Sequence, residues 1–495
     1  MTITGDQALM REINRMALVR AIQRIPGQSR AELAKETGLT KSTVSLLVQD
    51  LIEAGWLVES DIQATGAIGR RPTPIFLDGV RLAMIGAEIS VESQSISALT
   101  VSLTGDVING SQEPLPSTQP ADVIQRLAHL IASLVRQSEQ DGRELLGIGI
   151  GVPGAVLDQQ GMVKLAPNFA WRDVALQSAL AQELESLGVT GLRIQVQNDY
   201  DVAALSEYEF GSPPQPDPLI YLGLGVGVGA GIIVRDRLFL GAEGFAGEVG
   251  HSILQLEGPV CSCGRKGCAE TFIGLRAIST QIIGHAGDLI PVETIRHLLD
   301  RNDEAAALAV RRAGHYLGVL IQNLWTYFNP GRIVLGGPSC ELGAPFLDAA
   351  QTCLERYSQD CGLPLPEIQL SRFGSRSVAV GAAANTRRAL ALEADALAVG
   401  HPSRNPHVQG LGGEAGALAH GIGLRQVDKA RVHAMAAGPL QRLPLGRELG
   451  KRVERRLAGR VQHLLGRVGF GGDEVIILGE TGLFHFIVEL GGHEG

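Results

Sequence analysis

Three cysteines within eight residues, preceded by one histidine, place the strongest constraint on how this chain can fold. His251 is followed by Cys261, Cys263 and Cys268. Three thiolates and one imidazole make a complete tetrahedral ligand set for structural zinc, with no position left for a reacting water. The alternative is a disulfide with one spare thiol, but a Cys-x-Cys bridge would be strained. We therefore predict that these four residues bind a structural Zn2+ ion.

Composition limits the class of protein. At 495 residues, with 45% hydrophobic and 19% charged residues, the chain is long enough for two to four domains. No run of eighteen or more apolar residues occurs and the start of the chain lacks a secretory-signal pattern, so no membrane association is expected. Six cysteines are too few for a disulfide framework, which predicts a cytoplasmic location. The net charge of −9 argues against broad nucleic-acid binding but permits a small DNA-reading module.

Residues 1–78 have the pattern of a winged helix-turn-helix domain. A first helix is predicted from apolar residues at helical spacing. Ser29 and Glu32 form a capping box that opens a second helix. Thr40 caps a third helix, predicted over residues 41–54. This succession is typical of domains that place the third helix in the major groove of DNA.

The third helix and the loop between the two strands that follow carry the candidate DNA contacts. The helix turns small, polar and nearly uncharged side chains outward, as expected for reading base edges; they are Lys41, Ser42, Thr43, Ser45 and Gln49. Strands are predicted at residues 56–59 and 74–77, and the wing between them carries Arg70 and Arg71. These arginines are expected to enter a minor groove or bind phosphates. The alternative is a helical protein-interaction domain with an ordinary basic loop.

From residue 82 the pattern changes to short apolar strands, glycine turns and helices. Two rounds of this pattern are predicted, with strands at residues 83–89, 95–103, 146–152, 219–224 and 229–234 and helices at residues 121–137 and 304–328. Two similar rounds predict two α/β lobes with a ligand cleft between them.

Several glycine-rich and polar segments of this body resemble the ROK family of repressors and sugar kinases. They are Gly149–Gly154, Ala166–Asn168, Gln197–Asp199, Gly225–Gly231, the Glu248–His251 and cysteine segment, and Val334–Gly337. The resemblance implies a two-lobed actin-like, ribonuclease-H-like fold that binds a sugar or phosphosugar, in a homodimer or homotetramer. The amino-terminal domain resembles that of the regulatory branch. The expected domains are residues 1–78, a first lobe at 82–200, a second lobe with the zinc loop at 201–395, and an atypical extension at 396–495.

The same resemblance assigns the sugar side of the cleft. Asp199 matches the position of the family's catalytic base, here expected to be vestigial. Sugar contacts are implied for Asn168, Asn198, Asp199, Glu248, His251 and Glu270. Amides and carboxylates suit the directional hydrogen bonds of sugar hydroxyls. The histidine is expected to bind zinc through one ring nitrogen and to orient the sugar side through the other.

The nucleotide side departs from the family's kinases. Those enzymes carry an Asp-x-Gly-Gly-Thr loop, whereas the matching residues here are Glu88–Glu92. Ser90 and Val91 replace the two glycines, and Glu92 replaces the threonine with a carboxylate that would repel phosphate. In the second glycine loop, Val226 stands in place of a threonine.

These departures predict a non-enzymatic, sugar-responsive regulator that binds operator DNA, most simply as a repressor of carbohydrate catabolic genes. The alternative is an ATP-dependent hexose or N-acetyl-amino-sugar kinase with an accessory DNA-binding head. A third hypothesis is a DNA-bound scaffold that senses a partner protein.

The tail beyond residue 395 differs from the body. Residues 401–495 hold nineteen glycines and seven of the twelve histidines. An amphipathic helix is predicted at residues 452–468, and two strands near residues 474–478 and 484–488 are expected to pair.

Overall fold

The computed structural model describes residues 7–60, 73–211, 215–285, 288–362 and 364–398, together with four short strands of the tail. It separates into two compact units, Met1–Arg404 and Asn405–Gly495. Among the described residues, no helix combines the length and hydropathy needed to cross a bilayer. The wing arginines Arg70 and Arg71 lie outside the described residues.

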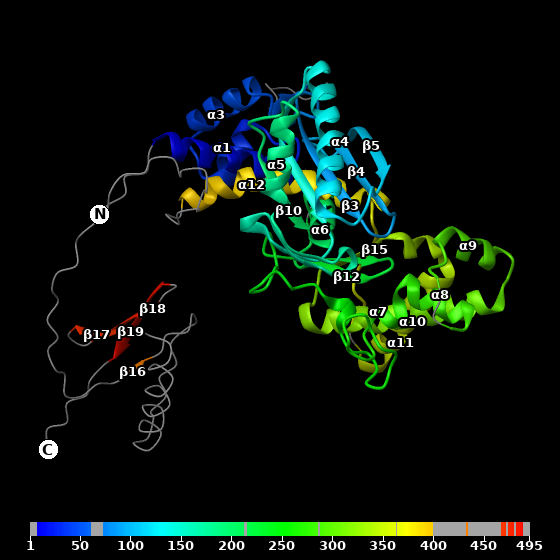
Figure 1. Cartoon of the computed structure of the whole chain (residues 1–495). Helices are drawn as coiled ribbons and strands as arrows, with labels where there is room; N and C mark the ends of the chain where they lie inside the picture. Colours follow the sequence, from blue (N-terminus) through cyan, green and yellow to red (C-terminus); the bar gives the residue numbers. More distant parts are fainter. Residues whose placement is uncertain are drawn as a thin grey trace, which may run out of the picture. The chain divides into compact units, whose positions relative to one another are not determined.

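The amino-terminal head has the predicted winged-helix order (Figure 1). Its elements are α1 (Gln7–Arg24), α2 (Arg30–Thr37), α3 (Lys41–Glu53), β1 (Leu57–Glu59) and β2 (Ile75–Leu77), the two strands pairing antiparallel. Both predicted caps are present. The Ser29 side chain accepts from the Glu32 backbone amide while the Glu32 carboxylate accepts from the Ser29 amide, and Thr40 accepts from the amide of Thr43.

The first lobe is built on a five-stranded sheet in the order β10-β6-β3-β4-β5. Its strands are β3 (Leu82–Ser90), β4 (Ser95–Ser102), β5 (Val107–Pro114), β6 (Glu144–Val152) and β10 (Ile194–Asn198). Helices α4 (Pro120–Gln140) and α5 (Leu176–Ser186) share a core with this sheet. A small sheet of β7 (Ala155–Leu157), β8 (Met162–Ala166) and β9 (Trp171–Val174) follows β6. Strand β5 is an addition to the predicted pattern.

The second lobe repeats the plan with the sheet order β13-β12-β11-β14-β15. Its strands are β11 (Leu219–Leu224), β12 (Val228–Val234), β13 (Arg237–Leu238), β14 (Arg332–Gly336) and β15 (Ile368–Leu370). Its helices are α7 (Glu270–Ile273), α8 (Leu275–Ile283), α9 (Val292–Asp300), α10 (Glu304–Phe328) and α11 (Ala344–Cys361). The predicted two α/β lobes are thus confirmed.

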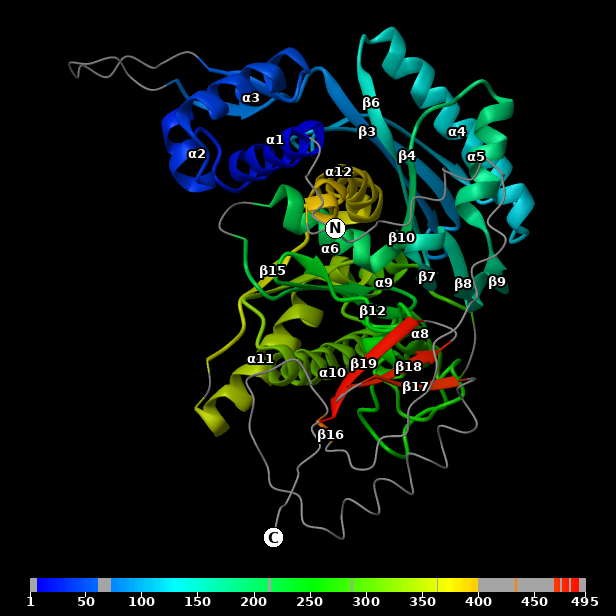
Figure 2. The ribbon, with the colours of Figure 1, turned by 90° about the vertical axis from the view of Figure 1, so that its left-hand side faces the viewer.

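Two helices lie between the lobes and reach the head. Helix α6 (Asp199–Phe210) packs on β11 and β12, and α12 (Ser377–Ala398) packs on α6, β3 and β6. The sheet of the first lobe is therefore covered in part by α12, which comes from the carboxyl-terminal end of the body. Helix α1 of the head packs against α12 (Figure 2), and apolar residues of the head, α6 and α12 form one continuous core. The head is packed onto the body rather than merely tethered to it.

The second unit contains a sheet in the order β16-β19-β18-β17. Its strands are β16 (Val432–His433), β17 (Arg467–Gly471), β18 (Glu474–Gly479) and β19 (Gly482–Val488). The expected pairing of the last two strands is confirmed. The predicted helix is wrong at its end, because Val468 pairs with Ile477 in the β17–β18 ladder; its residues 452–466 lie outside the described part.

Candidate functional site

The candidate DNA-reading surface is the outer face of α3. Lys41, Ser42, Ser45 and Gln49 are exposed, whereas Thr43 is half-buried, its hydroxyl 2.8 Å from that of Thr40. Leu46, which the sequence interpretation left out of this face, is 58% exposed among them. An apolar side chain on such a face suits contact with a thymine methyl group. Helical spacing alone could have indicated it, since Leu46 lies four positions after Ser42 and three before Gln49.

The six candidate sugar-side residues come together in one cleft. Asn168, Asn198, Asp199, Glu248, His251 and Glu270 all line it, drawn from both lobes. The cleft has a volume of about 2160 Å3, larger than the roughly 300–1,000 Å3 of a typical small-molecule site. It therefore has room for a sugar and for further groups beside it.

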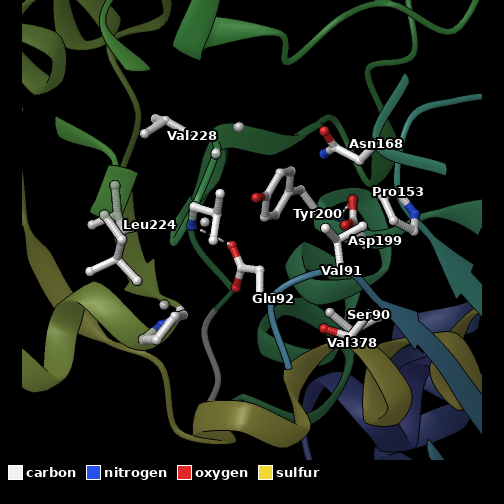
Figure 3. Close-up of a pocket in the computed structure, with 18 of the residues that line it drawn as sticks. Ser90, Val91, Glu92, Pro153, Asn168, Asp199, Tyr200, Leu224, Val228 and Val378 are labelled. Atoms are coloured by element: carbon white, nitrogen blue, oxygen red, sulfur yellow. Dashed lines mark hydrogen bonds between the residues drawn. The ribbon is translucent and has the colours of Figure 1, made fainter. Parts of the chain in front are cut away.

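The floor of the cleft is the start of α6. Asn198 caps this helix, its Oδ1 accepting from the amides of Tyr200 at 2.8 Å and Asp201 at 3.2 Å, while its Nδ2 donates to the carbonyl of Gly154 at 2.9 Å. The Asp199 carboxyl lies near the side chains of Tyr200 and Pro153 (Figure 3). Burial raises the pKa of Asp199 to about 7, against the lowering effect of the Tyr200 amide. A carboxyl that titrates near neutrality is able both to accept and to donate hydrogen bonds to a hydroxyl.

A second carboxyl near Asp199, that of Glu92, connects the two lobes. Glu92, in the turn between β3 and β4, accepts through Oε1 from the backbone amide of Val226 at 3.0 Å (Figure 3). A Cβ atom at Gly225 would lie 1.6 Å from the same oxygen, so this side chain fills the space against the glycine loop. Burial, then the charge of Asp199, raise the pKa of Glu92 to about 7, and burial raises that of Glu88 to about 8. The sequence interpretation noted the Glu92 charge but missed this contact.

The histidine and the three cysteines form the group that the sequence predicts. Their ligand atoms all lie within 4.8 Å of one another. Cys263 and Cys268 are 3.7 Å apart at sulfur, and Cys261 Sγ is 3.6 Å from Nδ1 of His251. Zinc bonds of about 2.3 Å to sulfur and 2.0–2.1 Å to nitrogen, set tetrahedrally, imply separations of roughly 3.8 and 3.5 Å. The group has the composition and spacing to hold a metal ion, and its thiols are not joined as disulfides.

This group lies directly against the cleft. Nε2 of His251, the nitrogen that faces away from the sulfurs, is 3.7 Å from Glu248 Oε2. Glu270 lies 3.8 Å from Cys261 Sγ through one oxygen and accepts from the Val228 amide at 3.3 Å through the other. A metal ion held here would therefore fix the side of the cleft that carries Glu248 and Glu270.

A winged-helix head on a two-lobed, actin-like body with a polar cleft defines a class of regulatory proteins built on a sugar-kinase fold. A model of the ROK family matches residues 89–389, and a model of the MarR family matches residues 12–64. The chain belongs to the ROK family.

Two relatives are similar to this chain over most of their length. The chain is 30% identical over 391 residues to the xylose repressor of Caldicellulosiruptor bescii, covering 76% of this chain and 96% of the relative. It is 27% identical over 395 residues to the DNA-binding transcriptional dual regulator NagC of Escherichia coli, covering 78% and 95%.

Solved structures agree with this fold. A ROK family transcriptional regulator, a homologue of the E. coli MLC protein, superposes with a TM-score of 0.64 at 24% identity, over 80% of this chain and 100% of that one. A ROK family glucokinase from Streptomyces griseus, in complex with glucose and AMPPNP, gives a TM-score of 0.53 at 26% identity, over 62% and 99%.

Proposed function

We propose that this protein is a sugar-responsive transcription repressor that binds operator DNA through its head and a sugar or phosphosugar in its cleft. One observation carries the proposal: the winged helix and the cleft belong to one packed unit, joined through α6 and α12. Similarity to a xylose repressor and to a DNA-binding transcriptional dual regulator, over most of the length of each, supports it. The xylose in the name of the first relative supports control of carbohydrate catabolic genes.

The proposed DNA contacts are the α3 residues Lys41, Ser42, Thr43, Ser45 and Gln49, with Arg70 and Arg71 of the wing. The proposed sugar contacts are Asn168, Asn198, Asp199, Glu248, His251 and Glu270. A sugar shifts the DNA affinity only if it binds the DNA-competent and DNA-incompetent arrangements unequally. In a homodimer or homotetramer, a change in lobe closure would alter the spacing of two heads and so weaken operator binding.

The test begins with DNA duplexes enriched by the full chain from a random-sequence library. Their affinity is measured by fluorescence anisotropy with and without a panel of pentoses, hexoses, N-acetyl sugars and their phosphates. Gln49→Ala should lose selectivity among duplexes. Gln351→Ala is the matched control, because Gln351 donates to Glu355 at 2.9 Å as Gln49 donates to Glu53 at 3.0 Å. Failure to enrich any duplex, or a wild-type affinity that no sugar alters, would refute the proposal.

We infer further that the protein does not use ATP. Glu92 fills the space against Gly225 with a carboxylate that would repel a triphosphate. The competing function is a sugar kinase, favoured by the position of Asp199 in the cleft and by the glucokinase fold. A coupled ADP-release assay across the sugar panel separates the two. Turnover in the wild type that Asp199→Asn abolishes would establish the kinase, whereas no sugar-dependent ADP release supports the regulator.

We propose zinc as the ion held by His251, Cys261, Cys263 and Cys268. Zinc suits this ligand set because three sulfurs and one imidazole nitrogen complete a tetrahedron around it. The ion would therefore stabilise the loop without activating a water molecule. Metal analysis of protein purified without chelator should give one zinc per chain. Protein that is folded and free of metal would contradict this assignment.

We also propose the division of function along the chain: residues 1–78 bind DNA, residues 82–200 and 201–395 form the two lobes of the sugar site, and residues 396–495 are an extension outside it. The oligomeric state, proposed as a homodimer or homotetramer, is tested by light scattering with size-exclusion chromatography.

A further inference from the structure

Helix α6 reaches from the cleft to the head. Its first turn carries Asn198 as the cap and Asp199 on the cleft floor, and Glu209 stands in its last turn. Twelve helical residues span about 18 Å at 1.5 Å per residue. If α6 moves as a rigid body, a displacement of its first turn also displaces Glu209 in its last turn.

Close backbone packing holds α6 to its neighbours. A Cβ atom at Gly381 of α12 would lie 1.6 Å from the carbonyl oxygen of Val202, and one at Gly231 of β12 would lie 2.1 Å from that of Tyr200. Neither contact leaves room for a side chain between the helix and its support. Interiors packed this tightly transmit displacement instead of absorbing it.

At the far end, Glu209 is the centre of a buried ionic network. Its side chain is only 6% exposed. Arg387 donates to its Oε2 at 2.9 Å and Arg388 donates to its Oε1 at 2.6 Å, both from α12. Burial alone would raise the pKa of Glu209, but these two guanidinium groups lower it, so the carboxylate stays charged.

The network reaches the head through Gln23 and the second lobe through Asp236. Gln23 of α1 donates through Nε2 to the Glu209 carboxylate at 2.7 Å and to its backbone carbonyl at 3.1 Å. Arg388 also donates to the carboxylate of Asp236 at 3.1 Å and to its carbonyl, in the turn between β12 and β13 of the second lobe. The head contacts Glu209 directly, and the second lobe is joined to the same network through Arg388.

We propose that Glu209 couples the sugar cleft to the DNA-reading head, and that Gln23 is the positioning residue through which the head follows it. This inference rests on the proposed function and names how it is regulated. A change in lobe arrangement moves Asp236 relative to Arg388, and a change at Asn198 or Asp199 moves α6. Either displaces Glu209 and with it the hydrogen bonds that orient α1.

The test uses Gln23→Leu in the full chain. Gln23 is uncharged, so its loss leaves Glu209 paired with both arginines and the cleft untouched. The probes are a duplex enriched by the wild type and whichever of D-xylose, N-acetylglucosamine or N-acetylglucosamine 6-phosphate raises the wild-type melting temperature. The measured quantity is the ratio of DNA dissociation constants with and without that sugar. For the wild type we expect a ratio within the roughly 5- to 150-fold range of allosteric coupling.

For Gln23→Leu we expect this ratio to fall to within about twofold of one, while the sugar dissociation constant from calorimetry stays within about twofold of wild type. A merely structural defect would weaken sugar binding as well. Faster hydrogen–deuterium exchange in α1 should accompany the loss. Glu12→Gln is the control, because Glu12 pairs with Arg15 on the exposed surface of the same helix, and it should keep the wild-type ratio.

The outcomes separate this inference from the proposed function. A wild type whose DNA affinity ignores every sugar probe overturns the proposed function, and the inference with it. A wild type that responds, together with Gln23→Leu that responds equally, overturns the inference alone. Asp236→Asn provides a second variant, which should reduce the ratio of DNA dissociation constants with and without sugar but retain sugar binding. An unchanged ratio would show that the contact with the second lobe takes no part in the coupling.

Discussion

Replacing Glu92 with glutamine should remove one defined part of the pH dependence of stability. The carboxylate accepts from the Val226 amide, yet burial and the charge of Asp199 raise its pKa from 4.5 to about 7. Glutamine keeps an oxygen acceptor of the same reach for that amide but does not titrate.

The sign and size follow from linkage. Between pH 4.5 and about 7 the folded protein holds a proton on Glu92 that the unfolded chain has released. Stability is therefore highest below the unfolded pKa and is lost as the pH rises through the folded pKa. Between about pH 5.5 and pH 8, this one group lowers the free energy of unfolding by about 2 kcal/mol.

The assay is urea unfolding followed by tryptophan fluorescence at those two pH values. The wild type should be less stable at the higher pH, and Glu92→Gln should lose about 2 kcal/mol of that difference. Glu139→Gln makes the same chemical change on the exposed face of α4 and should leave the difference as it is. A Glu92→Gln protein with the full wild-type pH dependence would refute the assignment of a buried, titrating carboxyl between the lobes.

Three further predictions follow from the site and the packing. Cys263→Ser should lose the bound metal by elemental analysis and lower the melting temperature, whereas Ser262→Ala should keep both; unchanged metal content in the first variant would contradict the ligand set. Gly381→Ala should cost about 1–3 kcal/mol or more in urea unfolding, because its Cβ would meet the Val202 carbonyl; an unchanged midpoint would mean that α6 and α12 are loosely packed. Leu46→Ser should weaken binding to an enriched duplex by roughly tenfold while leaving the melting temperature unchanged. An unchanged affinity would show that Leu46 does not contact DNA.

Sequence signals of short range predicted the local structure well. The capping box at Ser29 and Glu32 and the Thr40 cap join residues three positions apart, so the pattern itself holds the geometry. The group of His251 and three cysteines could be predicted equally well, because its cysteines lie within eight residues and one tight loop brings them together.

Contacts between distant residues could not be predicted in the same way. Glu92 and Val226 are 134 positions apart, and Gln23 and Glu209 are 186 apart. Each side chain is ordinary in its local sequence, and only the sheet order and the return of α12 to β3 and β6 bring the partners together. Strand β5 escaped prediction for a related reason: it pairs only with β4 at the sheet edge and lacks a buried face.

Two glutamates, Glu92 and Glu209, show how the surroundings of a carboxyl decide whether it keeps its charge. At Glu92, burial and then the charge of Asp199 raise the pKa to about 7, although the Val226 amide favours the carboxylate. Near Glu209 stand two guanidinium groups, which lower its pKa despite burial. The cleft should therefore change charge near neutrality or on meeting a ligand, while the junction with the head keeps its charge. Any pH dependence of DNA binding in this protein should then originate in the cleft and reach the head through a network whose own charges stay constant.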